Sequence, residues 1–353
     1  PPPPAALPAV EEASSGPPTE GGIELVDRGV GAGLAPHERG PEGTVPVVRF
    51  DVEAYLARTP DLPATMADFT PWPVPAPGAN DRYYTNLFRE TEGNDGAYAF
   101  LNVWDNWGAF SGDTSIRQVS VSAGNVCGSL GCTPNQTIES GLIEYGPEPH
   151  GVTLDAADPT VFVYYTLDGY QTPGDFAGGY NALVAGWVQR SPVMAPGLSV
   201  PQDLSVHNGT QVAARVDVRL FRGNWWVGFD GIFMGYYPAS IFAEVDGLRN
   251  QGERVTWYGE VFDSFAPDPS PTGMGSGRHA EERFGRAAYV RDPVRYMDGD
   301  TGLGAWSCVE DTRPATDPDC YSKLPMIGPV SGRSSFRCYT YYGGPGAWDG
   351  SCN

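Results

Sequence analysis

Two glutamates stand in apolar, strand-like surroundings where a charged side chain is costly. Glu139 lies in the run Thr137–Ile143, and Glu260 lies in the run Val255–Phe262. Strand alternation places Glu260 on the same face as the aromatic ring of Tyr258. Two carboxyl groups that share a site cannot both ionise easily, so such a pair can serve as general acid and general base. The alternative for each glutamate is a strand residue that faces solvent.

Other familiar catalytic arrangements are missing from the sequence. The four histidines form no H-E-x-x-H pattern, and we expect neither a metal ion nor a cofactor. Gly275-Ser276-Gly277 lacks the G-x-S-x-G frame of a hydrolase nucleophile. Asp300-Thr301-Gly302 occurs once, whereas a single-chain aspartic protease needs two such triplets. The two glutamates therefore remain the best candidates for chemistry.

Charge and composition limit the partners and the fold class. The 353-residue chain has a formal net charge of −21, so nucleic acid and anionic membrane surfaces are poor partners. No stretch approaches the roughly 18–20 consecutive apolar residues that a membrane-spanning helix needs. The chain contains 46 Gly and 34 Pro, and only 18% of its residues are charged. This composition favours short strands joined by tight turns over long solvated helices.

The cysteine content predicts disulfide bonds and export. The even number, the turn-rich surroundings and the lack of C-x2-C pairs favour disulfides over a metal site and a secreted location over the cytosol. The chain begins at Pro1 with no visible signal peptide, which we interpret as an export signal already removed. The six cysteines are Cys127, Cys132, Cys308, Cys320, Cys338 and Cys352.

The first 80 residues differ from the rest of the chain. They contain 16 of the 34 prolines and end in the proline ladder Pro71–Pro77. We interpret residues 1–80 as a Pro-rich N-terminal pro-segment, with a short strand and helical turn in Val47–Leu62, and residues 81–353 as the main domain. A disordered linker is the alternative for the N-terminal part.

The elements that must position the glutamates are predicted to be strands. Thr160–Thr166 is β-branched and aromatic throughout, which predicts a central strand covered on both faces. In Ala214–Leu220, apolar and charged residues alternate, which predicts a strand with one face in water. Asn208-Gly209 and Asp230-Gly231 predict two-residue hairpin turns.

One helix is expected after Pro238, because apolar residues follow at helical spacing. These residues are Ile241, Phe242, Val245 and Leu248. Many strands, one or two short helices and no βαβ rhythm predict an all-β fold, an antiparallel β-sandwich of two large sheets, preceded by the pro-segment.

Several short motifs resemble those of the neprosin family of secreted glutamic peptidases. They occur in the family's order and cover about Ala97 to Cys352. The matching segments are Ile138–Gly141 (I-E-x-G), Val163–Gln171 (Y-W-T-x-D-G-Y-Q), Tyr180-Asn181 with Gly186–Gln189, Asn224–Trp226 (N-W-W), Gly235–Pro238 (G-Y-W-P), Trp257–Val261 (W-G-G-E-V), Met274–Gly277 (M-G-S-G), Phe284–Tyr289, and Cys338-Tyr339 with Tyr342–Gly346. Leu142 stands where the family has Trp after I-E-x-G, and Tyr258 replaces the first Gly of W-G-G-E-V.

The resemblance implies an endopeptidase that cleaves after proline, with Glu139 and Glu260 as its two catalytic residues. We expect these side chains to meet in one cleft and to share a proton, with no assignment of which is the acid, and activity to peak at acidic pH. The candidates for substrate binding are Gln118, Tyr165, Tyr170, Trp187 and Tyr258.

The resemblance also suggests a disulfide pattern. The family's close cysteine pair falls on Gly179 and Val184 here. We expect Cys127–Cys132 and Cys308–Cys320 as local replacements, and Cys338–Cys352 as the bond that is retained.

The proline ladder is itself a substrate of post-proline cleavage at the domain border. We expect residues 1–80 to block the cleft as an intramolecular inhibitor and to be removed autocatalytically in acid. The mature protein is expected to be a monomer that acts on proline-containing peptides.

Two other functions remain open from the sequence. A carbohydrate-binding β-sandwich would use Trp225, Trp226 and Tyr236 as stacking platforms. A glycosidase would also use two carboxyl groups.

Overall fold

The computed structural model describes most of the chain from residue 81 onward. The described residues are 3–4, 25–27, 44–45, 81–105, 113–124, 126–128, 131–133, 135–145, 158–171, 174–200, 204–263, 270–330, 335–349 and 352. The proline ladder Pro71–Pro77 and the segment Val47–Leu62 lie outside the described residues. The division into pro-segment and main domain therefore stays a prediction.

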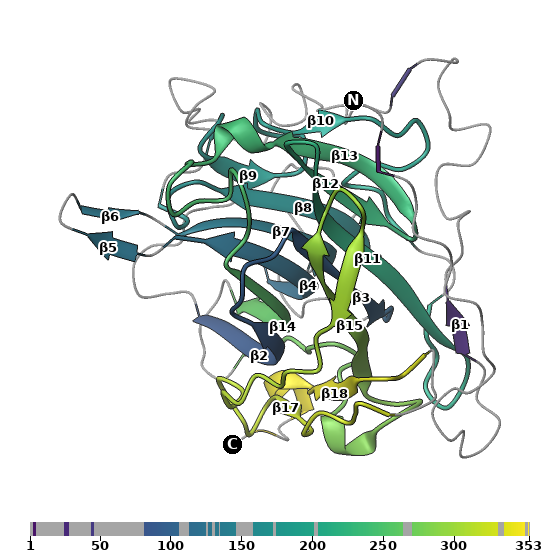
Figure 1. Cartoon of the computed structure of the whole chain (residues 1–353). Helices are drawn as coiled ribbons and strands as arrows, with labels where there is room; N and C mark the ends of the chain where they lie inside the picture. The colour runs from purple at the N-terminus through teal and green to yellow at the C-terminus, as the bar shows by residue number, and fades with distance from the viewer. Residues whose placement is uncertain are drawn as a thin grey trace, which may run out of the picture.

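Two large sheets make up the fold (Figure 1). The six-stranded sheet contains, in spatial order, β2 (Asp81–Glu90), β14 (Arg254–Asp263), β4 (Thr114–Ala123), β7 (Gln136–Tyr145), β8 (Thr160–Thr166) and β9 (Gly178–Tyr180). The ten-stranded sheet contains β10 (Val188–Gln189), β13 (Ile232–Pro238), β12 (Asn224–Phe229), β11 (Gln211–Phe221), β3 (Gly96–Asn102), β15 (Ala288–Asp298), β18 (Tyr339–Gly343) and β17 (Ser322–Lys323), with β1 (Leu25–Asp27) beside β11 and β16 (Leu303–Trp306) beside β15. A small hairpin of β5 (Val126–Gly128) and β6 (Gly131–Thr133) projects to one side (Figure 1).

Side chains from both large sheets form one hydrophobic core. Val119 and Leu142 of the six-stranded sheet are fully buried in the same cluster as Leu101 and Val216 of the ten-stranded sheet. Two sheets that bury their facing sides against each other form a β-sandwich. The predicted all-β antiparallel sandwich is therefore confirmed, although β1 pairs with β11 in parallel.

Strand β8 has the predicted bounds, and side chains on both of its faces are buried. The predicted wet face of β11 is wrong. Asp217 and Arg219 on that face are only 2% and 3% exposed. Asp217 accepts hydrogen bonds from Arg215 and from the hydroxyl of Tyr296 on β15. These paired charges are covered by neighbouring aromatic side chains, so alternation of polarity did not mean exposure to water.

The turn Asp230-Gly231 joins β12 to β13 with positive φ at both residues, 49° and 78°, as a type I′ hairpin requires. This hairpin prediction is confirmed. Asn208-Gly209 also forms a turn, in which the Gly209 N–H donates to the carbonyl of Val206 at 2.9 Å. It leads into β11, and because the described residues 204–206 before it form no strand, no two-stranded hairpin is present there among the described residues.

The helix predicted after Pro238 is wrong. Only the single 3-10 turn η2 (Ala239–Ile241) forms, and turns follow it. The side-chain oxygen of Gln136 on β7 accepts the backbone N–H groups of Ala243 and Leu248, so a contact with another strand holds this segment in place of helical bonds. Two other described 3-10 turns are η3 (Ala280–Glu282) and η4 (Gly346–Asp349). None of the helices among the described residues has the length and apolar character needed to cross a membrane.

Candidate active site

Strand register places both candidate glutamates on one face of the six-stranded sheet. Glu139 on β7 lies opposite Ser120 on β4, and Ser120 lies opposite Thr256 on β14. Glu260 lies four residues beyond Thr256 on the same strand, so its side chain points to the same side. Residues 121 positions apart in the sequence are thus brought onto one surface by the neighbouring strands β14, β4 and β7.

One row of residues separates the two glutamates. Tyr258 on β14 lies opposite Gln118 on β4, and Gln118 lies opposite Gly141 on β7. Because Gly141 has no side chain, no side chain from β7 stands on this row between the two glutamates. A Cβ atom at Gly141 would come within 2.0 Å of the backbone oxygen of Arg117, so only glycine allows β7 and β4 to approach this closely.

Glu139 is held by two tyrosine hydroxyl groups. The hydroxyl of Tyr170 donates a hydrogen bond to Glu139 Oε1 at 2.5 Å, and that of Tyr258 donates to the same oxygen at 3.1 Å. Glu139 is 7% exposed. Burial, and then the nearby charge of Glu260, raise the pKa of Glu139 to about 7, although the two tyrosine hydrogen bonds oppose the rise. This carboxyl group therefore holds its proton at acidic pH.

Glu260 has a different environment, with a positive charge in contact. Arg82 of β2 forms an ion pair with Glu260 Oε1, and Gln118 Nε2 donates a hydrogen bond to Glu260 Oε2 at 3.0 Å. Burial raises the pKa of Glu260, while Arg82 and Gln118 oppose this by stabilising the ionised form. Of the two groups, Glu260 is the one that its neighbours favour as a carboxylate.

The expectation that the two carboxyl groups share a proton is not met. Glu139 bonds to Tyr170 and Tyr258, Glu260 bonds to Arg82 and Gln118, and among these described residues no hydrogen bond joins the two glutamates. The reason is the register. The strands that carry them are separated by β4, roughly 10 Å at the usual strand spacing, and the two residues are also four positions apart along the strands, roughly 13 Å of rise.

Three of the five residues predicted to bind substrate lie at this site, namely Gln118, Tyr170 and Tyr258. Gln118 is 1% exposed, and its Oε1 has no hydrogen-bond partner within the described part of the chain. This oxygen is therefore a buried acceptor whose hydrogen-bonding capacity is unused among those residues.

The other two predicted residues, Tyr165 and Trp187, lie elsewhere. Tyr165 is on the opposite face of β8, fully buried in the core, where its ring packs 4.7 Å from that of Tyr237. Trp187 packs against Tyr237 as well and donates from Nε1 to Gln189 at 3.0 Å. Tyr165 lies in the core between the sheets and Trp187 is half-buried against it, and neither lines the pocket beside Glu139.

Sequence reasoning missed two tyrosines and one arginine of the site. Tyr164 on β8 lies opposite Glu139 and stacks on Tyr170 with ring centroids 5.7 Å apart. Tyr84 on β2 lies opposite Glu260, two residues after Arg82. Alternation within β2 could have placed Arg82 and Tyr84 on one face, but only the pairing of β2 with β14 brings them to Glu260.

A pocket of about 240 Å³ opens beside Glu139. Glu139, Tyr170 and Tyr258 form part of its wall, whereas Glu260 lies outside its lining. Ser120 and Thr256, which lie in the same strand row as Glu139, also line this pocket. Within the described residues, no three His, Cys, Asp or Glu side chains are grouped as a metal site would require.

A buried ion pair lies under the site, on the opposite face of the same strands. Arg117 of β4 donates to Glu144 of β7 at 2.5 Å and to the carbonyl of Trp104 at 2.6 Å. Arg117 and Glu144 are 1% and 0% exposed. Removal of one partner would leave an uncompensated buried charge, so this pair ties β4 to β7 directly beneath Gln118 and Gly141.

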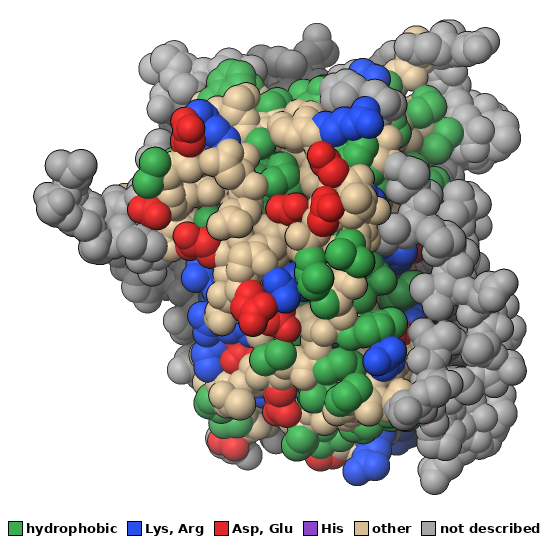
Figure 2. Space-filling view, in the orientation of Figure 1, with side chains coloured by type: hydrophobic (Ala, Val, Ile, Leu, Met, Phe, Trp, Pro, Cys, Tyr) green, Lys and Arg blue, Asp and Glu red, His purple; other side chains and the backbone are tan. Residues whose placement is uncertain are grey.

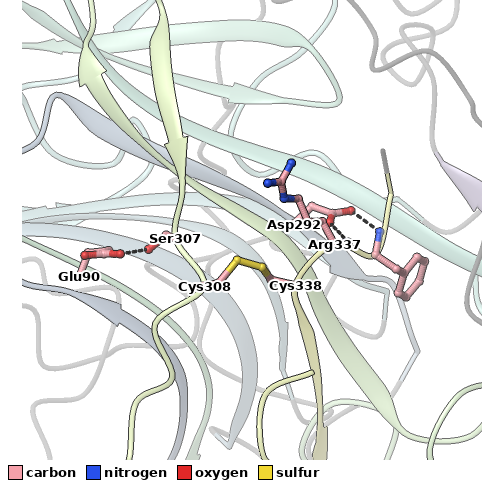
Figure 3. The surroundings of a disulfide bond; sticks show 7 residues. Glu90, Asp292, Ser307, Cys308, Arg337 and Cys338 are labelled. Carbon is pink, nitrogen blue, oxygen red and sulfur yellow. Dashed lines mark hydrogen bonds between the residues drawn. A yellow bond between two sulfur atoms is a disulfide. The ribbon is translucent and has the colours of Figure 1, made fainter. Parts of the chain in front are cut away.

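The disulfide pattern differs from the expected one. Cys308 bonds to Cys338, with Cα atoms 5.6 Å apart (Figure 3). Cys320 bonds to Cys352, with Cα atoms 4.8 Å apart. The predicted Cys308–Cys320 and Cys338–Cys352 bonds are therefore wrong. The side chains of Cys127 and Cys132 lie outside the described residues, although their backbones face each other in the β5–β6 hairpin.

Strand pairing explains the bond between Cys308 and Cys338. Strands β16 and β18 lie one after the other along β15, so the end of β16 and the start of β18 meet at its centre. The backbone of Ser307 donates to Pro293, and the backbone of Asp292 donates to the carbonyl of Cys338. Figure 3 shows Asp292 beside this bond, where it also accepts the backbone N–H of Arg337.

The comparison with known protein families decides to which family the chain belongs. The family model described as Neprosin matches residues 112–345. The chain belongs to the neprosin family. The matched range includes both Glu139 and Glu260, as well as Gln118 between them. Membership in the neprosin family supports a peptidase function in the broad sense, and the motif resemblance is confirmed at the level of the family.

Proposed function

We propose that this chain is a secreted, acid-active endopeptidase that cleaves peptide bonds after proline, with Glu139 and Glu260 as its catalytic residues. The observation that carries the proposal is the convergence of these two glutamates on one sheet face in opposite electrostatic settings. Arg82 and Gln118 favour the carboxylate form of Glu260, while burial keeps Glu139 protonated at acidic pH.

The geometry supports a division of roles. Glu260 as a carboxylate accepts a proton from a water molecule, whose oxygen then attacks the scissile carbonyl carbon. Glu139 donates its proton to the leaving amine as the C–N bond breaks, after hydrogen-bonding to the developing oxyanion. The free Oε1 of Gln118 can orient the water through its second hydrogen. Glu260 ends protonated and Glu139 ionised, and one proton transfer through solvent restores the starting state.

Aromatic side chains beside the glutamates suit an apolar, flat residue such as proline. Tyr164 and Tyr180 are half-buried on this face, with ring centroids 4.5 Å apart. They pack on a buried apolar base of Ile116 and Ile143, in the row of Glu260, and Phe162, in the row beside it. No cationic anchor is required for proline.

The proposal extends to secretion and processing. Two disulfide bonds are typical of an oxidising compartment. We propose that residues 1–80 inhibit the site in cis and are cleaved after one of the prolines in Pro71–Pro77. Incubation of the purified protein at acidic pH should then give a shorter chain that starts within or just after this ladder, while E260Q stays intact. Equal shortening of purified E260Q would overturn self-processing.

The test of the activity compares wild type, E139Q and E260Q, with E244Q as a matched control. Glu244 is an exposed glutamate whose side chain is 69% accessible. Proline-containing peptides and their Pro→Ala counterparts are digested from pH 3 to pH 9 and analysed by mass spectrometry. We expect cleavage after proline, an activity decline above about pH 7 as Glu139 loses its proton, and a loss of about 100-fold to 10,000-fold in both site variants.

Unchanged cleavage by E139Q or E260Q would overturn the catalytic assignment. Release of sugar but no peptide would point to a glycosidase. A carbohydrate-binding module is disfavoured, because its stacking candidates Trp225 and Trp226 are fully buried.

A further inference from the structure

Three arginines converge on the pocket beside Glu139, at the end away from Glu260. Arg89 on β2 lies opposite Thr256, and Arg254 begins β14 two residues before it. Arg313 reaches the same pocket from the segment after β16. In Figure 2, Lys and Arg side chains gather along the left side of the molecule, level with β2 and β14 in Figure 1.

From this arrangement we propose that Arg89, Arg254 and Arg313 form a subsite that binds a carboxylate of the peptide substrate. The proposal rests on the peptidase function proposed above and adds a specificity to it. The chain has 22 Lys and Arg among 353 residues and 43 Asp and Glu. Acidic residues thus outnumber basic ones in the chain, whereas three arginines line this pocket. Glu139 is the only carboxyl group among the described lining residues.

Two of these arginines have no carboxylate in direct contact among the described residues. Arg313 is held by Asp311, which accepts from its Nε at 2.9 Å. Among the described residues, Arg254 donates only to the neutral Asn135 Oδ1 at 2.8 Å, and Arg89 Nε is buried with no hydrogen-bond partner. No ion pair joins Arg89 or Arg254 to a described carboxylate.

Like charges that lie close together in a partly buried site repel one another. Burial, and then the charge of Arg89, lower the pKa of Arg254; Arg313 adds to this, and the charge of Glu253 opposes it. A bound anion would relieve this repulsion and fill the open hydrogen-bonding positions, and the planar guanidinium group matches a carboxylate in geometry. Peptides supply such a group either as an Asp or Glu side chain or as the C-terminal carboxylate.

The register also indicates where in the substrate the carboxylate lies. Thr256 lies in the same strand row as Glu139. Arg254 lies two residues from Thr256 along β14, a distance of about 7 Å. An extended peptide advances about 3.3 Å per residue. The carboxylate is therefore expected about two to four residues from the scissile bond, on one side of it only.

The experiment uses peptides with one fixed proline and a Glu or Gln placed in turn at each of four positions on either side of the bond. Each peptide is made with a free C-terminus and with a C-terminal amide, which separates the two sources of carboxylate. Cleavage is followed at pH 6 for wild type, R254Q, R89Q and the control R286Q. Arg286 is a half-exposed arginine that pairs with Glu282 at 2.9 Å, outside the pocket lining.

We expect Glu to raise kcat/KM over Gln by about 10-fold to 100-fold at one position, or the free acid to do so over the amide. This ratio should fall towards 1 in R254Q and R89Q and stay unchanged in R286Q. It should also shrink in 1 M salt. As a readout that needs no turnover, the same peptides are titrated into E260Q by fluorescence anisotropy.

Cleavage at equal rates for Glu and Gln at every position, and for acid and amide, would overturn the subsite while the peptidase function stands. If no peptide is cleaved, the proposed function fails, and the binding titration still decides the subsite. Tighter binding of carboxylate peptides that is lost in E260Q/R254Q supports it, and equal binding of all peptides overturns it.

Discussion

The buried carboxyl group of Glu139 should make the stability of the folded protein depend on pH in an unusual direction. Its pKa is raised from 4.5 to about 7 in the folded state. The folded protein therefore holds this proton more tightly than the unfolded chain does. The resulting stabilisation is complete below about pH 4.5 and is lost as the pH rises through about 7. Most salt-bridged carboxylates behave in the opposite way.

The perturbation is Glu139→Gln, which removes the ionisation but keeps an oxygen for the hydroxyl groups of Tyr170 and Tyr258. Both proteins carry Glu260→Gln so that neither digests itself. At about 1.4 kcal/mol per pKa unit, the full rise from 4.5 to about 7 corresponds to about 3.5 kcal/mol. The Glu260→Gln change removes the contribution of the Glu260 charge to the raised pKa of Glu139, which is smaller than the contribution of burial. We therefore expect about 2 kcal/mol.

The assay is urea unfolding at pH 4 and pH 8, with the free energy of unfolding obtained by linear extrapolation. The free energy of unfolding of E139Q/E260Q minus that of E260Q should rise by about 2 kcal/mol from pH 4 to pH 8. The matched control E244Q/E260Q changes an exposed glutamate and should differ from E260Q by less than about 0.5 kcal/mol at both pH values. If the difference between E139Q/E260Q and E260Q is the same at pH 4 and pH 8, the Glu139 carboxyl group is not desolvated and the reasoning fails.

Three further predictions concern the surroundings of the site. Gly141→Ala forces a Cβ atom against the backbone oxygen of Arg117, so we expect a loss of at least about 3 kcal/mol in unfolding free energy or failure to fold, measured by urea titration. Tyr258→Phe removes a hydrogen bond that opposes the rise in the Glu139 pKa, so the alkaline limb of the kcat/KM profile should move to higher pH; a move to lower pH would contradict this. A non-reducing peptide map should join Cys308 to Cys338, and a linkage of Cys308 to Cys320 would show the bond pattern to be wrong.

Local strand patterns were sufficient to predict the strands of both glutamates and their faces. Glu139 and Glu260 lie in segments whose side chains alternate, and alternation is a property of each strand by itself. The same logic failed in β8, where Tyr164 and Tyr165 are neighbours in a strand buried on both faces. Without a polar face, nothing in the sequence tells which tyrosine points towards the site.

The site residues and disulfide bonds that the sequence did not predict depend on pairing between strands that are far apart in the chain. Arg82 meets Glu260 only because β2, which begins directly after the Pro-rich region, pairs with β14 far along the chain. The family resemblance led us to pair cysteines that are neighbours in the sequence, yet Cys308 meets Cys338 because β16 and β18 share one edge of β15. Sequence distance carries no information about such an edge.

The two disulfide bonds in the C-terminal part of the chain overlap in sequence. One spans residues 308–338 and the other spans residues 320–352, so every peptide bond between residues 308 and 352 is bridged by at least one of them. This stretch contains five prolines, each of which an endopeptidase of the proposed specificity can attack in a neighbouring molecule. A single cut there would leave both fragments tethered, so a nicked molecule would keep its β17 and β18 strands and migrate as one chain until it is reduced.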